Sequence, residues 1–157
     1  MHRLALAALA LALLAACQPA TTELTEEQKA EIEEAVAQAA IAHGVSWRAQ
    51  EDIDEYMSYA SDWGFVPWNY ESPDDWRSLT LRFWERWDWE SHENRDVQVL
   101  VLGPDAAAVQ MIGVGVIRDT AGVAVDRTSH IKQVWVREAG EWKLLVARNA
   151  FTDREQL

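Results

Sequence analysis

Apolar residues recur at intervals of three and four in the first half of the chain, a spacing that predicts amphipathic helices. The predicted helices span residues 25–47, 53–61 and 73–87. Thr25 and Gln28 have the spacing of a capping box, in which each side chain bonds the backbone amide of the other residue. Asp52 is a typical N-cap for the second helix. Ser72 and Pro73 are typical of an N-cap and the first helical position of the third.

From residue 96 onward the pattern changes to runs of apolar residues separated by short turns, each of which contains a glycine. The predicted strands span residues 96–102, 106–118, 123–137 and 142–151. Consecutive strands joined by such turns pair as an antiparallel meander. Because the helices come first and the strands last, the sequence predicts an α+β fold. Residues 65–70 are expected to be extended, with Pro67 at an edge or in a loop.

The first residues have the pattern of an export signal. Arg3 gives the start a positive charge, and an uninterrupted run of leucine and alanine follows over residues 4–16. The run is shorter than the ~20 residues that span a bilayer, but it has the length of a signal-peptide core. Leu14-Ala15-Ala16-Cys17 resembles a lipobox, the motif at which bacterial lipoproteins are cleaved and lipidated. An ordinary secretory signal that happens to end at a cysteine is the alternative.

The lipobox implies three parts of the chain. Residues 1–16 are a cleaved signal, residues 17–24 are a tether lipidated on Cys17, and residues 25–157 are a single domain. Lipid on the N-terminus makes the membrane a partner and places the protein in the cell envelope. By the same resemblance, Gln18 in place of an aspartate implies the periplasmic face of the outer membrane if the cell is Gram-negative.

The composition narrows the expected partners. The formal net charge is −12 at pH 7, and so acidic a surface repels phosphate backbones, which argues against binding to nucleic acid. The sequence has no paired His or Cys ligand motif and no glycine-rich phosphate loop, so neither a metal nor a cofactor is expected. Nine tryptophans, most of them between Trp47 and Trp89, are the unusual feature. Aromatic side chains of this size dominate both cores and binding pockets.

Three segments carry a resemblance to a known family. Residues 51–62 are similar to its second helix and the acidic end of that helix, residues 103–109 to the turn into its second long strand, and residues 133–145 to its Trp-Lys hairpin. With the order of the predicted elements, they make residues 28–151 resemble the nuclear-transport-factor-2-like superfamily, in particular its SnoaL-like branch. The resemblance implies a cystatin-like cone, in which a strongly curved antiparallel sheet wraps the long N-terminal helix and leaves an apolar cavity at the open end.

The sequence departs from the enzymes of this superfamily, which also includes domains that only bind or dimerise. The isomerase type has a carboxylate after the second helix, where this chain has Phe65-Val66-Pro67-Trp68. The first helix lacks the expected tyrosine. Many SnoaL-like sequences carry histidines on the last strand, where this chain has Val146, Arg148 and Ala150. Whether the protein is an enzyme stays open, and the unmatched positions favour a non-enzymatic role.

A group of aromatic and polar residues is the candidate lining of a ligand pocket. The group is Trp63, Trp68, Tyr70, Trp76, Trp84, His130 and Arg148. The aromatic members suit a flat or apolar molecule, although Trp76 and Trp84 also fit an ordinary core face. His130 and Arg148 are the catalytic candidates, as acid/base and anion contact, with a structural histidine and an exposed paired arginine as the alternatives. His43 is expected in the core and His92 in a surface loop.

These observations lead to three hypotheses. The first is an envelope lipoprotein whose domain binds a small hydrophobic or aromatic ligand. The second is a small enzyme of the polyketide cyclase, dehydratase or isomerase type. The third is an interaction module that forms a homodimer through the outer face of its sheet.

Overall fold

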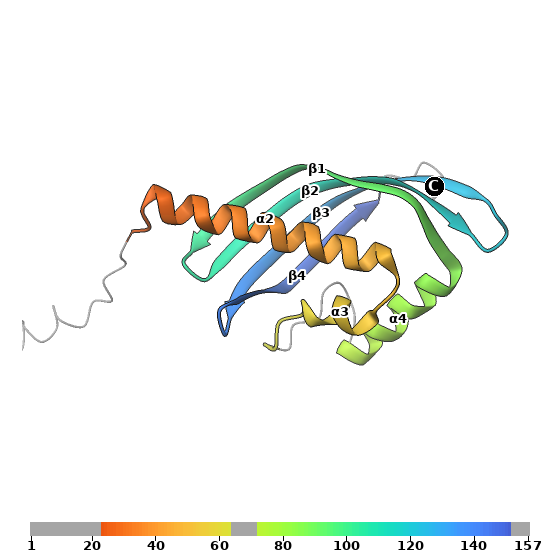
Figure 1. The fold of residues 1–157 in the computed structure, drawn as a ribbon, viewed down its shortest axis with the longest axis horizontal. Coiled ribbons are helices and arrows are strands. Elements are labelled where there is room, and N and C mark those ends of the chain that lie inside the picture. The colour runs from red at the N-terminus through yellow and green to blue at the C-terminus, as the bar shows by residue number, and fades with distance from the viewer. Residues whose placement is uncertain (1–22, 64–71, 152–157) are drawn as a thin grey trace, which may run out of the picture.

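The computed structural model describes residues 23–63 and 72–151, and the fold within these ranges is α+β (Figure 1). The helices are α2 (Glu26–Ala49), α3 (Ile53–Ser58) and α4 (Pro73–Arg86). The strands are β1 (Trp87–Gly103), β2 (Ala106–Asp119), β3 (Ala124–Glu138) and β4 (Glu141–Phe151). The strands form one antiparallel sheet in the order β1-β2-β3-β4, which confirms the predicted fold class and meander. The extended segment expected over residues 65–70 lies outside the described residues.

The helices begin where their capping residues predict. The Thr25 hydroxyl accepts a hydrogen bond from the Gln28 amide at 3.2 Å, and the Gln28 side chain accepts one from the Thr25 amide at 2.9 Å. The Ser72 hydroxyl accepts from the Asp75 amide at 3.1 Å, and Pro73 is the first residue of α4. Each bond satisfies an amide that the helix itself leaves without a partner, so these starts are set by local chemistry.

α3 ends at Ser58, before the predicted residue 61, because the chain then joins the sheet. The Ser61 amide donates to the Leu144 carbonyl at 3.0 Å, and the Leu144 amide donates to the Tyr59 carbonyl at 2.6 Å. The Lys143 ammonium donates to the Ser58 carbonyl at 2.9 Å. Backbone groups that pair with a strand cannot also continue a helix, so β4 fixes the end of α3.

β1 begins at Trp87, and the prediction that the sheet starts at residue 96 was wrong. The partly buried positions in the missed stretch are Trp87, Trp89, His92 and Asn94. Charged residues fill most of the outward positions and hide this apolar-polar alternation. A register shift between Trp89 and Ser91 also interrupts the period of two. His92 therefore belongs to a strand, where a surface loop was expected.

The sheet is curved, and β1 shows the cause. Its pairing with β2 shifts register between Trp89 and Ser91 and again between Arg95 and Gln98. Asp96, within the second shift, has a φ of 52°. Such bulges bend a strand and increase its twist. Figure 1 shows β1 curving from the level of α2 at one end to α4 at the other.

The core lies between α2 and the sheet. Ile32, Val36 and Ala40 form a buried stripe on α2 at a spacing of four residues, which places them on one helix face. They belong to one cluster with Trp135 and Leu144, both of which are fully buried. α2 therefore covers the sheet with its N-terminal and central turns.

Substitution of Gly115 on β2 tests how closely β1 and β2 approach each other at the first bulge. A methyl group on it would lie 2.2 Å from the Ser91 carbonyl oxygen and 3.0 Å from the Trp89 ring. We expect Gly115→Ala to lower the free energy of unfolding by about 1–3 kcal/mol in urea denaturation, because the backbone must shift. Gly103→Ala is the matched control, since a methyl group there would meet no heavy atom within 4 Å beyond its chain neighbours. Equal effects of the two substitutions would contradict this close packing.

Candidate functional site

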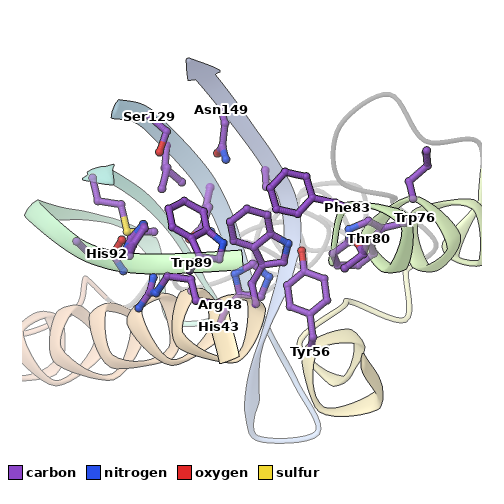
Figure 2. Close-up of a pocket in the computed structure, with 18 residues that line it drawn as sticks. His43, Arg48, Tyr56, Trp76, Thr80, Phe83, Trp89, His92, Ser129 and Asn149 are labelled. Atoms are coloured by element: carbon purple, nitrogen blue, oxygen red, sulfur yellow. The ribbon is translucent and has the colours of Figure 1, made fainter. Parts of the chain in front are cut away.

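A cavity of about 270 Å³ lies between the helices and the inner face of the sheet (Figure 2). Side chains from α2, α3, α4 and each strand line it. Small-molecule sites in proteins usually measure about 300–1,000 Å³, so this volume suits a small ligand. Figure 2 shows the labelled side chains projecting from helices and strands toward a common space.

Aromatic rings form much of the cavity wall. Trp47 of α2 stacks on Phe83 of α4, with ring centroids 5.2 Å apart, and meets the edge of Trp89 of β1 at 5.3 Å. Tyr56 of α3 lies edge-on to Trp76 of α4 at 5.2 Å. Aromatic pairs with centroids 4.5–7 Å apart contribute about 0.5–1.5 kcal/mol beyond their buried area. These contacts fix the wall and join three helices to β1.

Helix and strand periodicity explains why these residues meet. His43 and Trp47 are four apart on α2 and continue the stripe that is buried further toward its N-terminus. Trp76, Thr80 and Phe83 share one face of α4 at spacings of four and three. The strands contribute alternate residues, since neighbours along a strand point to opposite faces.

Several polar atoms of the lining are buried and have no hydrogen-bond partner within residues 23–63 and 72–151. They are His43 Nε2, Trp89 Nε1, His92 Nδ1, both amide atoms of Asn94, and Asn149 Oδ1. Buried polar side-chain atoms in proteins are almost always hydrogen-bonded. Each unsatisfied group costs about 1–3 kcal/mol. Their concentration in one cavity indicates a place where partners from outside the chain bind.

Arg48 carries the only formal charge among the described lining residues at neutral pH. Burial lowers the pKa of Arg48, although an arginine remains charged. Burial and, to a smaller extent, the Arg48 charge lower the pKa of His43 to about 4. The same two causes lower the pKa of His92 to about 4. Both imidazoles are therefore neutral at pH 7, and the cavity is weakly positive.

Of the aromatic residues predicted to line a pocket, the structure brings Trp76 into the cavity, where it is 2% exposed. Trp84 is not among the residues that line the cavity, and its ring centroid lies 6.1 Å from that of Tyr56. Trp63 is 68% exposed and lies outside the cavity. Trp68 and Tyr70 lie outside the described residues, as does Cys17.

His130 and Arg148 lie on the opposite face of the sheet from the cavity. Both are exposed, and together with Lys132 they line a shallow depression of the outer face. Trp135 determines which residues of β3 face inward. It is fully buried, and its Nε1 donates to Gln133 Oε1 at 2.9 Å. The odd-numbered residues of β3 from Ser129 to Trp135 therefore face inward, and His130 faces out. These two residues do not share a site with Trp76, contrary to expectation.

Most of the polar lining was not predicted. His43 was expected as a satisfied core residue, yet its Nε2 has no partner in the described part of the chain. Arg48, Asn94 and Asn149 carried no signal of their own in the sequence. The alternation of Trp87, Trp89, His92 and Asn94 was the signal that could have found part of the site, once the bulge is allowed for.

Two further features of the described residues bear on function. No three His, Cys, Asp or Glu side chains among them are grouped closely enough to hold a metal ion. None of the helices described is both long and apolar enough to cross a bilayer.

Comparison with known proteins adds a structural likeness. No protein-family model and no curated protein sequence matches the chain. A ketosteroid isomerase-like protein from Erwinia carotovora atroseptica is 17% identical with a TM-score of 0.68, covering 83% of this chain and 99% of that chain. A hexachlorocyclohexane dehydrochlorinase is 11% identical with a TM-score of 0.63, and the match covers 85% of this chain and 95% of that chain. The association domain of C. elegans CaMKII is 14% identical with a TM-score of 0.60, covering 80% and 99%.

These likenesses establish the class of fold. The chain has the cystatin-like architecture of nuclear-transport-factor-2-like proteins, as its sequence predicted. The similar structures are, by their names, an isomerase-like protein, a dehydrochlorinase and an association domain. The same architecture thus serves different functions in different proteins, and at these identities it assigns no activity to this chain.

His43 should make the stability of the domain depend on pH. Its pKa is about 4 in the folded protein and about 6.5 when unfolded, so between these values only the unfolded chain binds the proton. The free energy of unfolding should fall as pH falls from 6.5 toward 4, by about 3 kcal/mol in all from this residue. We expect His43→Leu to flatten this slope in urea denaturation at a series of pH values. Val36→Ala, which destabilises the core without removing a titrating group, should leave the slope unchanged.

Proposed function

We propose that the domain binds a small, flat and mostly apolar molecule in the cavity between α2, α4 and the sheet. The observation that carries the proposal is the meeting of aromatic walls and unpartnered polar atoms in one space. Each Å² of apolar ligand surface that leaves water contributes about 25 cal/mol. The polar atoms add orientation, since each can form a hydrogen bond that the described chain does not supply.

Catalysis is the weaker candidate for this cavity. The imidazoles of His43 and His92 each have a ring nitrogen without a partner among the described residues, as a proton acceptor requires. A general base works best when its pKa lies near the operating pH. The pKa of each is about 4, so both are poor proton acceptors at pH 7. The geometry therefore favours binding over acid-base catalysis.

Association through the outer face of the sheet is a second candidate, favoured by exposed apolar side chains. Leu100 and Leu102 are 64% and 58% exposed, and Leu100 lines an outer depression with Lys132 and Arg148. A two-fold dimer centred on this depression would bring like charges together, which weakens the candidate. Association of this kind is compatible with a ligand in the cavity, because the two surfaces lie on opposite faces.

We also propose that the domain is held on the membrane of the cell envelope by lipid on Cys17. The support is the lipobox-like Leu14-Ala15-Ala16-Cys17 and the apolar run before it. More than one acyl chain on a single residue is needed for a stable anchor. A tether over residues 18–24 would then separate the membrane from the domain, which begins with α2.

Binding in the cavity is tested by calorimetric titration with 2-naphthol, a flat and mostly apolar probe. We expect saturable binding that Trp47→Ala weakens about tenfold, because the variant removes a stacked wall. Trp63→Ala is the control, since Trp63 is 68% exposed and does not line the cavity. Thermal denaturation of both variants would show that they fold. Equal weakening by the two substitutions would place the probe elsewhere.

Lipidation is tested by expressing the full chain in a Gram-negative host grown with labelled palmitate. We expect the protein to carry the label and to sediment with membranes. Cys17→Ala should lose the label, because alanine offers no thiol to the lipid. Gln18→Ala, which leaves the thiol in place, should keep it. Label retained by Cys17→Ala would contradict the proposal.

A further inference from the structure

The charge inside the cavity is opposite in sign to that of the whole chain. The protein carries 26 aspartates and glutamates and a formal net charge of −12. None of these carboxylates is among the described residues that line the cavity, whereas the Arg48 guanidinium is. A cation placed among aromatic side chains costs free energy unless it has a partner.

Within residues 23–63 and 72–151, Arg48 has no acidic partner, unlike three other arginines. Arg77, Arg95 and Arg118 each form an ion pair, at 2.5, 2.6 and 2.7 Å. No carboxylate within the ranges described lies within ion-pair distance of Arg48, although the helix that carries it is rich in glutamate. Burial strips water from the guanidinium without supplying a counter-charge, and this costs free energy. An anion bound beside Arg48 would offset that cost.

Asn94 also lines the cavity and is suited to the same anion. A Cβ atom on Gly44 would lie 3.1 Å from Asn94 Nδ2 and 3.2 Å from Arg48 Nη1, so the two donors flank one point of α2. The absence of a side chain at Gly44 leaves room for both. Both amide atoms of Asn94 are buried without a partner among the described residues. An amide N–H and a guanidinium together match the two oxygens of a carboxylate.

The remaining lining defines the kind of anion. The described wall contains no second lysine or arginine, so it compensates one negative charge and not the two of a phosphate monoester. The imidazoles of His43 and His92 are neutral at pH 7 and add hydrogen bonds without charge. Most of the other wall residues are aromatic or aliphatic.

From this arrangement we infer that the ligand of the cavity is a small aromatic carboxylic acid, bound as its monoanion with the carboxylate on Arg48 and Asn94 and the ring against Trp47 and Trp89. This inference rests on the proposed function and makes it specific. Arg48 and Asn94 then act as selectivity residues, which discriminate between an acid and a neutral molecule of the same shape.

Two probes of nearly equal shape test the inference on the purified protein. 2-Naphthoate carries the carboxylate at pH 7, and 2-naphthol does not. We expect calorimetry to give a Kd at least tenfold lower for 2-naphthoate, since hydrogen bonds to a charged group are stronger than neutral ones. Arg48→Gln should remove most of this preference while changing the Kd of 2-naphthol less than threefold. Arg48→Lys, which keeps the charge but loses the two-pronged geometry, should retain part of it.

Arg148→Gln is the matched control, because Arg148 is an exposed arginine on the other face of the sheet. It should leave both dissociation constants unchanged. Equal affinity of the wild type for the two probes would overturn the inference but not the proposed binding. Loss of the preference in Arg148→Gln would also overturn it and place the anion on the outer face. Binding of neither probe would overturn the proposed function itself. Should Arg48→Gln not fold, the wild-type preference and Arg48→Lys decide the outcome.

Discussion

The stripe of α2 that faces the sheet is the constraint on which both the core and the cavity depend. Its first part, Ile32 to Ala40, is apolar and packs in the cluster of Trp135. Its continuation at the same helical spacing carries His43 and Trp47, which line the cavity. Each large apolar side chain buried in the core contributes about 1.5–3 kcal/mol, while each unsatisfied polar group costs about 1–3 kcal/mol. Burial of the core can therefore offset the cost of several unpartnered polar groups. Because α2 is a rigid helix, the packing of its first part also fixes the positions of His43 and Trp47.

The parts of the fold that follow from short-range chemistry could be predicted from the sequence. Thr25 and Gln28 satisfy each other's amides, and the Ser72 hydroxyl satisfies the amide of Asp75. These bonds lie within a few residues of the chain, so no tertiary contact is needed to locate the helix starts. The start of β1 could not be found in this way, because residues 87–95 alternate only after a register shift is introduced. Ser58 likewise ends α3 because of hydrogen bonds to β4, and these join residues far apart in sequence.

The candidate site was less accessible to sequence reasoning, since a strand has two faces and periodicity does not say which one is inside. Trp135 decides the question for β3: its burial turns Ser129 inward and His130 outward. The burial of Trp135 is thus the reason that His130, a predicted catalytic candidate, lies on the outer surface and not in the cavity. The position of Trp76 could be predicted, because a helix has a single apolar face and that face packs toward the interior. Arg48 could not be found from the sequence, because what distinguishes it is the lack of an ion-pair partner among the described residues. That property is visible only in the folded structure.

The acidic surface and the positive cavity act on an anionic ligand over different distances. Exposed carboxylates are screened by salt, with a Debye length of about 8 Å at physiological ionic strength. Their repulsion therefore slows the approach of an anion but fades as the ligand enters. Arg48 is partly buried, and charges away from water are screened much less. After burial, the charge of Arg48 is the second cause that lowers the pKa of both His43 and His92. Net charge thus governs how often a ligand arrives, whereas the local cation governs which ligand stays.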